Sequence, residues 1–252
     1  MKLSIITITY NAEKFLERTI ESVINQTERD FEYLIIDGGS KDGTLDIIRR
    51  YGNEITNYVS EKDKGIYDAM NKGLRLAKGD YIWFMNAGDQ INDIEVVRNL
   101  YNRLPENGDV YYGDTLLVDN EGNAQGLRSV ITPHKLPKIL TWKSFRYGMV
   151  VCHQSFIARK SIAPEYIPDH FYSADVDWEI QCLKNSKKII NLEIIVSRYL
   201  TGGFSIKNLK KSLLDRYSIL KKHFGFFNTV LAHILILFRG LTFVLKKKGK
   251  YW

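Results

Sequence analysis

The sequence predicts an α/β fold with a doubly wound, mostly parallel central sheet flanked by helices. Short runs of β-branched and apolar residues alternate with segments whose apolar residues recur at helical spacing. The run at 3–9 is rich in β-branched residues and mostly apolar, which is typical of a strand buried on both faces of a parallel sheet. The 252 residues are enough for one large domain with an appendage.

The first 90 residues contain the most regular part of this pattern. Strands are expected at 3–9, 33–36, 57–60 and 81–85. The segments between them favour helices at 12–26, 44–51 and 66–77, since apolar residues repeat there every three or four positions. We expect Asn11 to cap the first of these helices.

The pattern loosens after Asp89. The elements expected there are a helix at 94–104, a strand at 110–112, a hairpin at 116–127, strand segments at 149–151 and 155–157, a helix at 175–184 and a basic amphipathic helix at 206–224.

The net charge of +7 is concentrated at the C-terminus. Residues 206–252 contain eleven Lys or Arg and one acid, Asp215, a net of +10, so residues 1–205 carry about −3. This tail predicts contact with an anionic surface. The cysteines, Cys152 and Cys182, have no metal-ligand spacing and indicate buried thiols in a reducing compartment. The N-terminus lacks the pattern of an export signal, so a cytoplasmic location is expected.

Polar residues follow each of the four predicted strands. They are Thr9-Tyr10-Asn11, Asp37, Glu61-Lys62-Asp63 and Asn86 to Asp89. Ligands of a doubly wound sheet bind beyond the carboxyl ends of its strands, so these clusters are expected at one ligand-binding edge.

Asp89 is the candidate metal ligand. Mg²⁺ and Mn²⁺ prefer hard oxygen ligands, commonly one or two carboxylates completed by substrate phosphates. The alternative is an ordinary Gly-Asp turn in which Asp89 caps the next helix.

Three further sites each allow two interpretations. Asp37 either binds a base or ribose or serves as a cap, and the residues favour neither. Lys64 stands beside a predicted helix start, as a phosphate ligand or in a solvated turn. Asp175 is either a general base or one of several acids that complement a helix dipole. The residues alone favour the dipole interpretation.

Taken together, these motifs resemble the family 2 glycosyltransferases. The matching segments, in order, are 4–11, 36–40, 42–44, 65–73, 77–82 and 86–89, with a weaker match at Asp175. No GxSxG, HExxH, GxGxxG or Walker-type motif is present, which argues against hydrolases, zinc proteases, dehydrogenases and NTPases.

The resemblance implies a glycosyltransferase A-type fold and inverting transfer from a nucleotide-sugar, preferably a UDP-sugar, with Mg²⁺ or Mn²⁺. It implies a nucleotide-binding half at 1–90 and an acceptor half at 91–205, followed by a tail at 206–252. By position, the implied donor contacts are Thr9, Tyr10, Asp37, Lys64, Gly65, Asp68 and Asn86. Asp89 resembles the metal ligand and Asp175 the catalytic base.

This chain departs from the family pattern at three places. Gly38 stands where many relatives have a second acid after Asp37. Asn86 and Gly88 also replace acids, which leaves Asp89 as the expected sole carboxylate on the metal. Met70 replaces an Arg, whose role would pass to Lys64 or Lys72.

The apolar stretch at 224–245 is interrupted by Asn228, His233 and Arg239. Because Arg239 makes spanning costly, we expect a helix lying in the membrane interface, with its Lys residues on anionic lipid and Tyr251 and Trp252 at the headgroups. This predicts a peripheral protein on the inner face of the plasma membrane and a lipid-linked or saccharide acceptor in surface polysaccharide assembly. The alternative is a helix packed on the catalytic domain.

Two other functions fit parts of the pattern. One is a non-catalytic, membrane-tethered sugar-nucleotide-binding module, and the other is a nucleotidyltransferase on a similar α/β platform. No nucleic-acid partner is expected, because the basic tail carries no recognised binding motif and its apolar run suits lipid.

Overall fold

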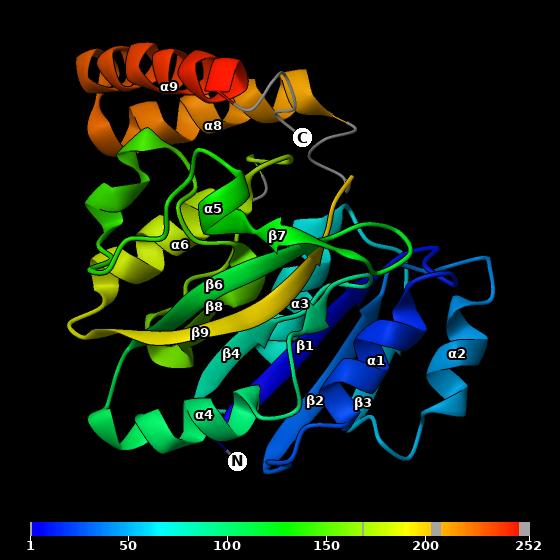
Figure 1. Ribbon diagram of the computed structural model, residues 1–252. Helices are drawn as coiled ribbons and strands as arrows, with labels where there is room; N and C mark the ends of the chain where they lie inside the picture. Colours follow the sequence, from blue (N-terminus) through cyan, green and yellow to red (C-terminus); the bar gives the residue numbers. More distant parts are fainter. Residues whose placement is uncertain (1, 168, 203–207, 247–252) are drawn as a thin grey trace.

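A computed structural model describes residues 2–167, 169–202 and 208–246. Its strands are β1 (Leu3–Thr9), β2 (Phe31–Asp37), β3 (Asn57–Ser60), β4 (Tyr81–Phe84), β5 (Gln90–Ile91), β6 (Val110–Val118), β7 (Ala124–Leu127), β8 (Phe156–Arg159) and β9 (Ile189–Leu200). They form one sheet in the order β3-β2-β1-β4-β8-β6-β9-β5, with β7 paired to β6 (Figure 1).

The α-helices are α1 (Leu16–Ile24), α2 (Thr44–Arg50), α3 (Ile66–Leu76), α4 (Val96–Arg103), α5 (Arg128–Ile131), α6 (Ala174–Asn185), α8 (Leu209–Phe224) and α9 (Phe226–Lys246). Short 3-10 helices occupy Leu104–Glu106, Trp142–Tyr147, His153–Ser155 and Lys160–Ile162. Gly225, with φ of 79°, joins α8 to α9 in a helical hairpin at one end of the molecule (Figure 1).

The predicted fold class is confirmed, with a mixed sheet. β3, β2, β1 and β4 are parallel, as expected from their apolar runs. β8 runs antiparallel to both β4 and β6, while β6 and β9 are parallel. The first half of the sheet is therefore doubly wound, and the second half continues it with the opposite strand direction at β8.

Alternate residues of the parallel strands pack into separate cores on the two faces of the sheet. Ile6 and Ile36 face the layer of α3 and α6, whereas Ile5 and Ile35 face the layer of α1, α2 and α4. A Cβ at Gly73 would lie 2.7 Å from Ile6 Cγ2, so this glycine permits the close approach of α3 to β1.

Several element boundaries differ from the predicted ones. α1 begins at Leu16, and Asn11 is not its cap: it has φ of 46°, and its side chain accepts a hydrogen bond from Lys41 N. Residues 149–151 are not a strand, and residues 153–155 form a 3-10 helix before β8. The long strand β9 was not predicted. The predicted start of the last amphipathic helix, at residue 206, lies outside the described residues.

Candidate functional site

The carboxyl ends of three parallel strands bring the predicted donor residues to one edge of the sheet. Thr9 at the end of β1 is in register with Asp37 at the end of β2, and Gly38 N donates to Thr9 O at 2.9 Å. On the other side, the segment after β4 continues along β1, since Ala87 N donates to Ile8 O at 3.0 Å. The predicted convergence of these clusters is therefore present.

Two polar atoms at this edge lack partners among the described residues. They are the buried Oγ1 of Thr9 and the buried Oδ1 of Asn86. A buried oxygen without a hydrogen bond is costly, by about 1–3 kcal/mol, and such an atom at a strand end marks a place where a ligand group can satisfy it.

Asp37 is fully buried and makes many intramolecular hydrogen bonds. Its Oδ2 accepts from Gly39 N at 3.1 Å, Ser40 N at 3.0 Å and Ser60 Oγ at 2.6 Å, and its Oδ1 accepts from Ser40 Oγ at 2.5 Å. In this structure Asp37 fixes the loop that follows β2, and its role as a donor contact stays a prediction.

No function was predicted for Asp63 from the sequence, although it belongs to the polar cluster after the third strand. A Cβ at Gly38 would lie 2.9 Å from Asp63 Oδ2 and 3.2 Å from Tyr10 Cδ2, so this glycine permits both side chains to approach the main chain closely. The side chain of Tyr10 is 63% exposed, so its ring is accessible to a ligand. Burial raises the pKa of Asp63, and its ion pair with Lys72 opposes that shift.

Lys72 is consequently occupied. It forms ion pairs with Asp63 and, at 2.9 Å, with Glu61. Lys72 is therefore not free to take over the role of the Arg that Met70 replaces. Lys64 remains exposed at the start of α3, where its N–H donates to Asp68 Oδ2 at 3.0 Å. Gly65 has φ of 135°, and a Cβ there would meet Phe171 at 2.6 Å.

Asp89 is buried at the end of the turn after β4. Its Oδ1 accepts from Leu200 N at 2.9 Å, and its main-chain oxygen accepts from Thr19 Oγ1 at 2.7 Å. Burial raises the pKa of Asp89 to about 7, against the opposing effects of the Leu200 hydrogen bond and the Arg18 charge. Asp89 does not cap the next helix, because α4 begins only at Val96.

Asp175 lies in the first turn of α6 and faces α3. Its Oδ1 accepts from Tyr67 OH at 3.1 Å and from Val176 N at 3.0 Å. Tyr67 belongs to the same first turn of α3 as Asp68, so Asp175 adjoins the predicted donor-binding helix start. Asp175 and Asp177 both lie in the first turn of α6, where acids also complement the helix dipole.

Tyr199 lies on β9 beside Leu200, whose N–H donates to Asp89. Burial raises the pKa of Tyr199, and the negative charges of Asp89 and Asp175 raise it further.

The residues of this edge fit a divalent cation that has few protein ligands. The described residues contain no group of three His, Cys, Asp or Glu side chains that could hold a metal by themselves. Asp89 offers a carboxylate and Asn86 an unpaired amide oxygen, and diphosphate oxygens with water commonly complete such a shell.

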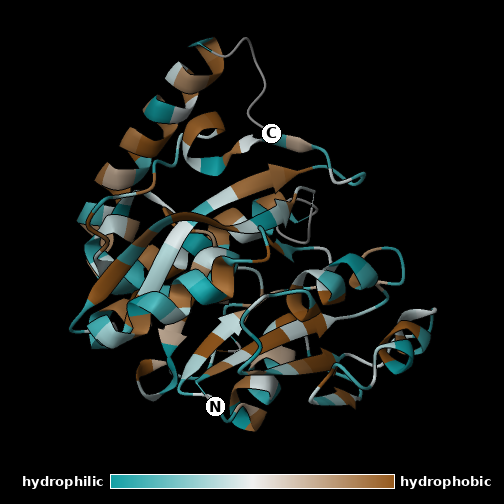
Figure 2. Cartoon of the chain, turned by 60° about the horizontal axis from the view of Figure 1, so that its bottom comes forward, coloured by the Kyte–Doolittle hydropathy of each residue, from teal (hydrophilic) through white to brown (hydrophobic). Residues whose placement is uncertain are grey.

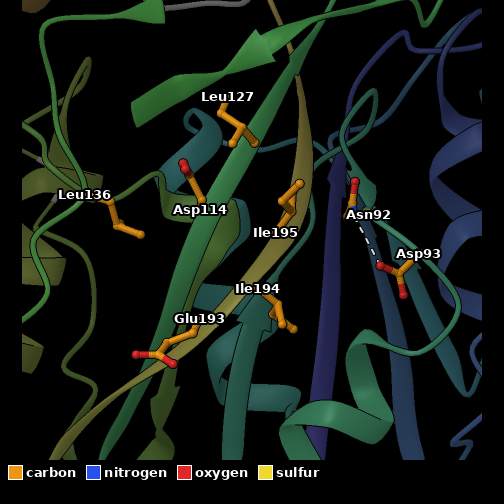
Figure 3. A pocket seen from close by; sticks show the side chains of 8 residues that line it. All are labelled: Asn92, Asp93, Asp114, Leu127, Leu136, Glu193, Ile194 and Ile195. Atoms are coloured by element: carbon orange, nitrogen blue, oxygen red, sulfur yellow. Dashed lines mark hydrogen bonds between the residues drawn. The ribbon is translucent and has the colours of Figure 1, made fainter. Parts of the chain in front are cut away.

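One cavity lies away from this edge. It measures about 470 Å³ and is lined by Asn92, Asp93, Asp114, Leu127, Leu136, Glu193, Ile194 and Ile195 (Figure 3). Its side chains come mainly from β6, β7, β9 and the segment after β5, and it contains none of the predicted donor, metal or base residues.

Curated relatives of this chain are glycosyltransferases. The PGL/p-HBAD biosynthesis glycosyltransferase of Mycobacterium bovis is 28% identical over 84% of this chain and 82% of its own length. A glycosyltransferase of Haemophilus influenzae is 27% identical over 94% and 96%, respectively.

Solved structures show the same fold. S. aureus TarS 1–349, in complex with UDP-GlcNAc, superposes with a TM-score of 0.69 at 21% identity, over 87% of this chain and 64% of that one. The mannosyltransferase PcManGT of Pyrobaculum calidifontis, in complex with GDP-Man and Mn²⁺, gives a TM-score of 0.61 at 16% identity, over 86% and 63%. This chain thus spans less than two thirds of either structure. Residues 4–166 match the model of glycosyl transferase family 2, so the chain belongs to this family and is a glycosyltransferase.

Proposed function

We propose that this glycosyltransferase moves a sugar from a nucleotide-sugar, preferably a UDP-sugar, to an acceptor hydroxyl with inversion at the anomeric carbon. The observation that carries the proposal is the meeting of Thr9, Asp37 and the segment Asn86 to Asp89 at the carboxyl ends of neighbouring parallel strands, with Asp175 against the first turn of α3. The complexes of TarS with UDP-GlcNAc and of PcManGT with GDP-Man support a nucleotide-sugar donor.

The donor site we propose extends from Tyr10 to the start of α3. The exposed Tyr10 ring stacks on the nucleobase near Gly38, and Asp63 accepts a hydrogen bond from the nucleobase. Thr9 Oγ1 and Asn86 Oδ1 gain the partners they lack. Lys64 and the N-terminus of α3, which follows Gly65, contact the phosphates, and Asp68 fixes this helix start by accepting from Lys64 N.

Asp89, with Asn86, would hold the Mg²⁺ or Mn²⁺ that neutralises the leaving nucleoside diphosphate. Asp175 receives the proton of the acceptor hydroxyl as that oxygen attacks the anomeric carbon. Tyr67 and Val176 hold its Oδ1, so Oδ2 is the oxygen directed to the proton.

Thermal unfolding with donor and metal tests the donor and metal sites together. We expect a UDP-sugar with Mn²⁺ to raise the melting temperature, because a ligand that binds only the folded state stabilises it by mass action. The pKa of Asp89 is about 7, so protons compete with the metal below that pH. The Mn²⁺-dependent increase should therefore grow from pH 6 to pH 8, and an increase that is independent of pH contradicts Asp89 as the ligand.

The tail supports our proposal of a peripheral protein on the cytoplasmic face of the membrane. α9 is long and apolar enough to span a membrane, and only 11% of its most apolar segment is buried in the protein. It packs on α8 and on residues 142–147. The exposed apolar side chains of its remaining surface are Phe227, Leu231, Ile234, Leu235, Leu237, Phe238, Leu241 and Leu245. Figure 2 shows that much of this last helix is hydrophobic. The predicted roles of Tyr251 and Trp252 lie outside the described residues.

A basic cavity beside this exposed face favours an anionic surface over a spanning arrangement. Lys135, Arg239 and Lys246 line a space of about 390 Å³ without any acid among its described lining residues. Arg239 donates to Tyr147 O at 2.8 Å, so its charge lies on the side of α9 that faces the rest of the protein. Binding to an anionic membrane surface would bring the active site close to a lipid-linked acceptor of surface polysaccharide assembly.

Deleting residues 225–252 should release the protein from vesicles that contain anionic lipid, since it removes α9 with its exposed apolar side chains. The measurement is co-sedimentation with anionic and with neutral vesicles. Replacing Leu231, Leu235 and Phe238 by Ser in the full-length chain serves as the matched variant, because it keeps the charges. Undiminished sedimentation of both variants would show that another part of the chain binds lipid.

A further inference from the structure

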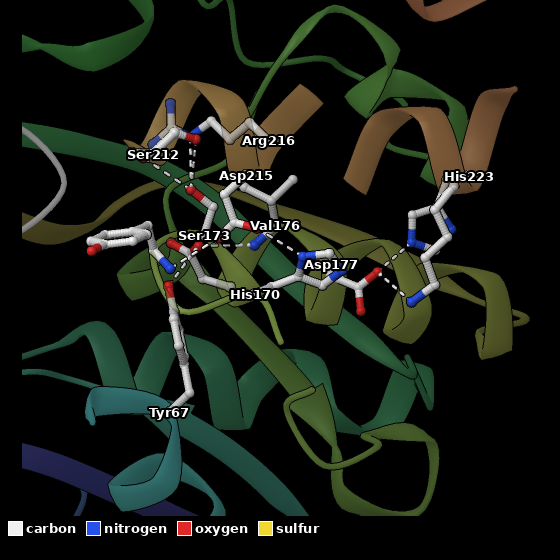
Figure 4. Close-up of polar contacts among 12 residues, drawn as sticks. Tyr67, His170, Ser173, Val176, Asp177, Ser212, Asp215, Arg216 and His223 are labelled. Atoms are coloured by element: carbon white, nitrogen blue, oxygen red, sulfur yellow. Dashed lines mark hydrogen bonds and ion pairs between the residues drawn. The ribbon is translucent and has the colours of Figure 1, made fainter. Parts of the chain in front are cut away.

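The first helix of the tail, α8, makes a set of polar contacts with the segment that leads into α6. Asp215 Oδ1 lies 2.8 Å from His170 Nδ1, and Asp215 Oδ2 accepts from Tyr172 N at 2.9 Å. Ser212 Oγ lies 3.0 Å from Ser173 Oγ. We call these contacts of Ser212 and Asp215 with residues 170–173 the α8 clasp (Figure 4).

The α8 clasp restrains the start of α6, which has no capping hydrogen bond from its N-cap side chain. Ser173 is this N-cap residue. Its fully buried hydroxyl turns to α8, where it donates to Ser212 O at 3.3 Å and accepts from Arg216 Nε at 3.4 Å. Asp175 is only two residues further along the chain, so α8 determines where this carboxylate emerges.

A second tie lies on the other side of Asp175. The carboxylate of Asp177 is buried against α8, with Oδ1 2.6 Å from His223 Nε2 and 3.4 Å from Lys222 Nζ. Burial alone would raise the pKa of Asp177, but these partners lower it. α8 thus holds residues before and after Asp175 and leaves Asp175 itself directed at Tyr67.

α8 is also part of the folded core, unlike the exposed α9. Ile219 and Leu220 are buried in the same apolar cluster as Ala174, Val176 and Trp178 of α6. Apolar packing therefore places α8 on α6, and the polar contacts set the register of residues 170–173 against it.

We propose that α8 is a positioning element of the reaction, with Asp215 and Ser212 as positioning residues that act through Asp175. This inference rests on the proposed role of Asp175 as the base. It means that the tail is not only an attachment to a surface: its first helix completes the acceptor side of the active site, and only α9 is dispensable for chemistry.

The variants Asp215→Asn and Ser212→Ala test this proposal in the full-length protein. Each should lower kcat by about 10-fold or more and leave the KM for the donor within about twofold, because a misplacement of roughly 1 Å is enough for such a loss. Asn228→Ala is the matched control: it removes the 2.9 Å contact of the tail with Arg146 but does not touch the α8 clasp. A control that loses as much kcat as Asp215→Asn would contradict the proposal, since any loosening of the tail would then suffice.

A double-mutant cycle separates the positioning role from the proposed function. If Asp215 acts through Asp175, Asp215→Asn should cost almost nothing further in an Asp175→Asn background, measured as nucleoside diphosphate release. Additive losses would overturn the positioning role. Full activity of Asp175→Asn alone would instead overturn the proposed function. Normal kcat in both Asp215→Asn and Ser212→Ala, with Asp175→Asn inactive, would remove only the present inference.

Discussion

Replacing Asp175 with Asn is expected to reduce kcat by roughly 10²–10⁴-fold, the usual worth of a positioned general base. The amide keeps the shape of the side chain, and its oxygen can still accept from Tyr67 OH and Val176 N. It cannot take the proton of an attacking hydroxyl. Donor affinity should therefore stay within about twofold, as measured by titration of a UDP-sugar with Mn²⁺ beside an assay of nucleoside diphosphate release.

This result distinguishes the base from an acid that only complements the dipole of α6. A dipole role is worth about 0.3–1 kcal/mol of stability and would leave kcat unchanged. Asp80→Asn, which changes an exposed acid in the turn before β4, is the control and should leave both quantities unaltered. Parallel loss of donor binding and turnover in Asp175→Asn would assign this residue a structural role.

Three strands of the parallel half, β1, β2 and β4, were predictable because they are buried on both faces, whereas the edge strand β3 is mostly exposed. Strands buried on both faces appear in a sequence as mostly apolar runs, as β1 and β2 do. β9 lacks this signature. It carries polar residues such as Ser197 and Arg198, Glu193 has φ of 58°, and its pairing with β6 shifts register twice. An irregular strand interrupts the alternation on which a prediction depends.

The site was predictable only residue by residue. The position of Asp89 after a buried strand indicated a ligand, whereas its hydrogen bond from Leu200 N comes from β9, which was not predicted. The contact of Asp215 with His170 likewise joins residues 45 positions apart. Spacing encodes neighbours within one element, but it carries no information on which side chains meet after the sheet and the tail have packed.

Replacing Asp89 with Asn is expected to remove metal-dependent turnover. A metal that stabilises the leaving diphosphate contributes several kcal/mol, so its loss corresponds to a decrease of about 100-fold or more in kcat. Asp89 is the one carboxylate we assign to the cation, and a neutral amide binds Mn²⁺ poorly. The Mn²⁺-dependent increase in melting temperature with a UDP-sugar should disappear together with turnover.

The same variant separates a metal ligand from a structural carboxylate through its stability without metal. Because burial raises the pKa of Asp89 to about 7, the folded protein binds this proton more tightly than the unfolded chain does. The stability contributed by this group is therefore present at low pH and is lost as the pH rises toward 7. Above pH 7, Asp89→Asn should equal or exceed the metal-free wild type in melting temperature, because the amide avoids burying a charge and can still accept from Leu200 N. Asp93→Asn, at an exposed acid four residues further on, should keep the full response to Mn²⁺. A destabilised Asp89→Asn protein that retains this response would show that the cation rests on other groups and that Asp89 serves the turn.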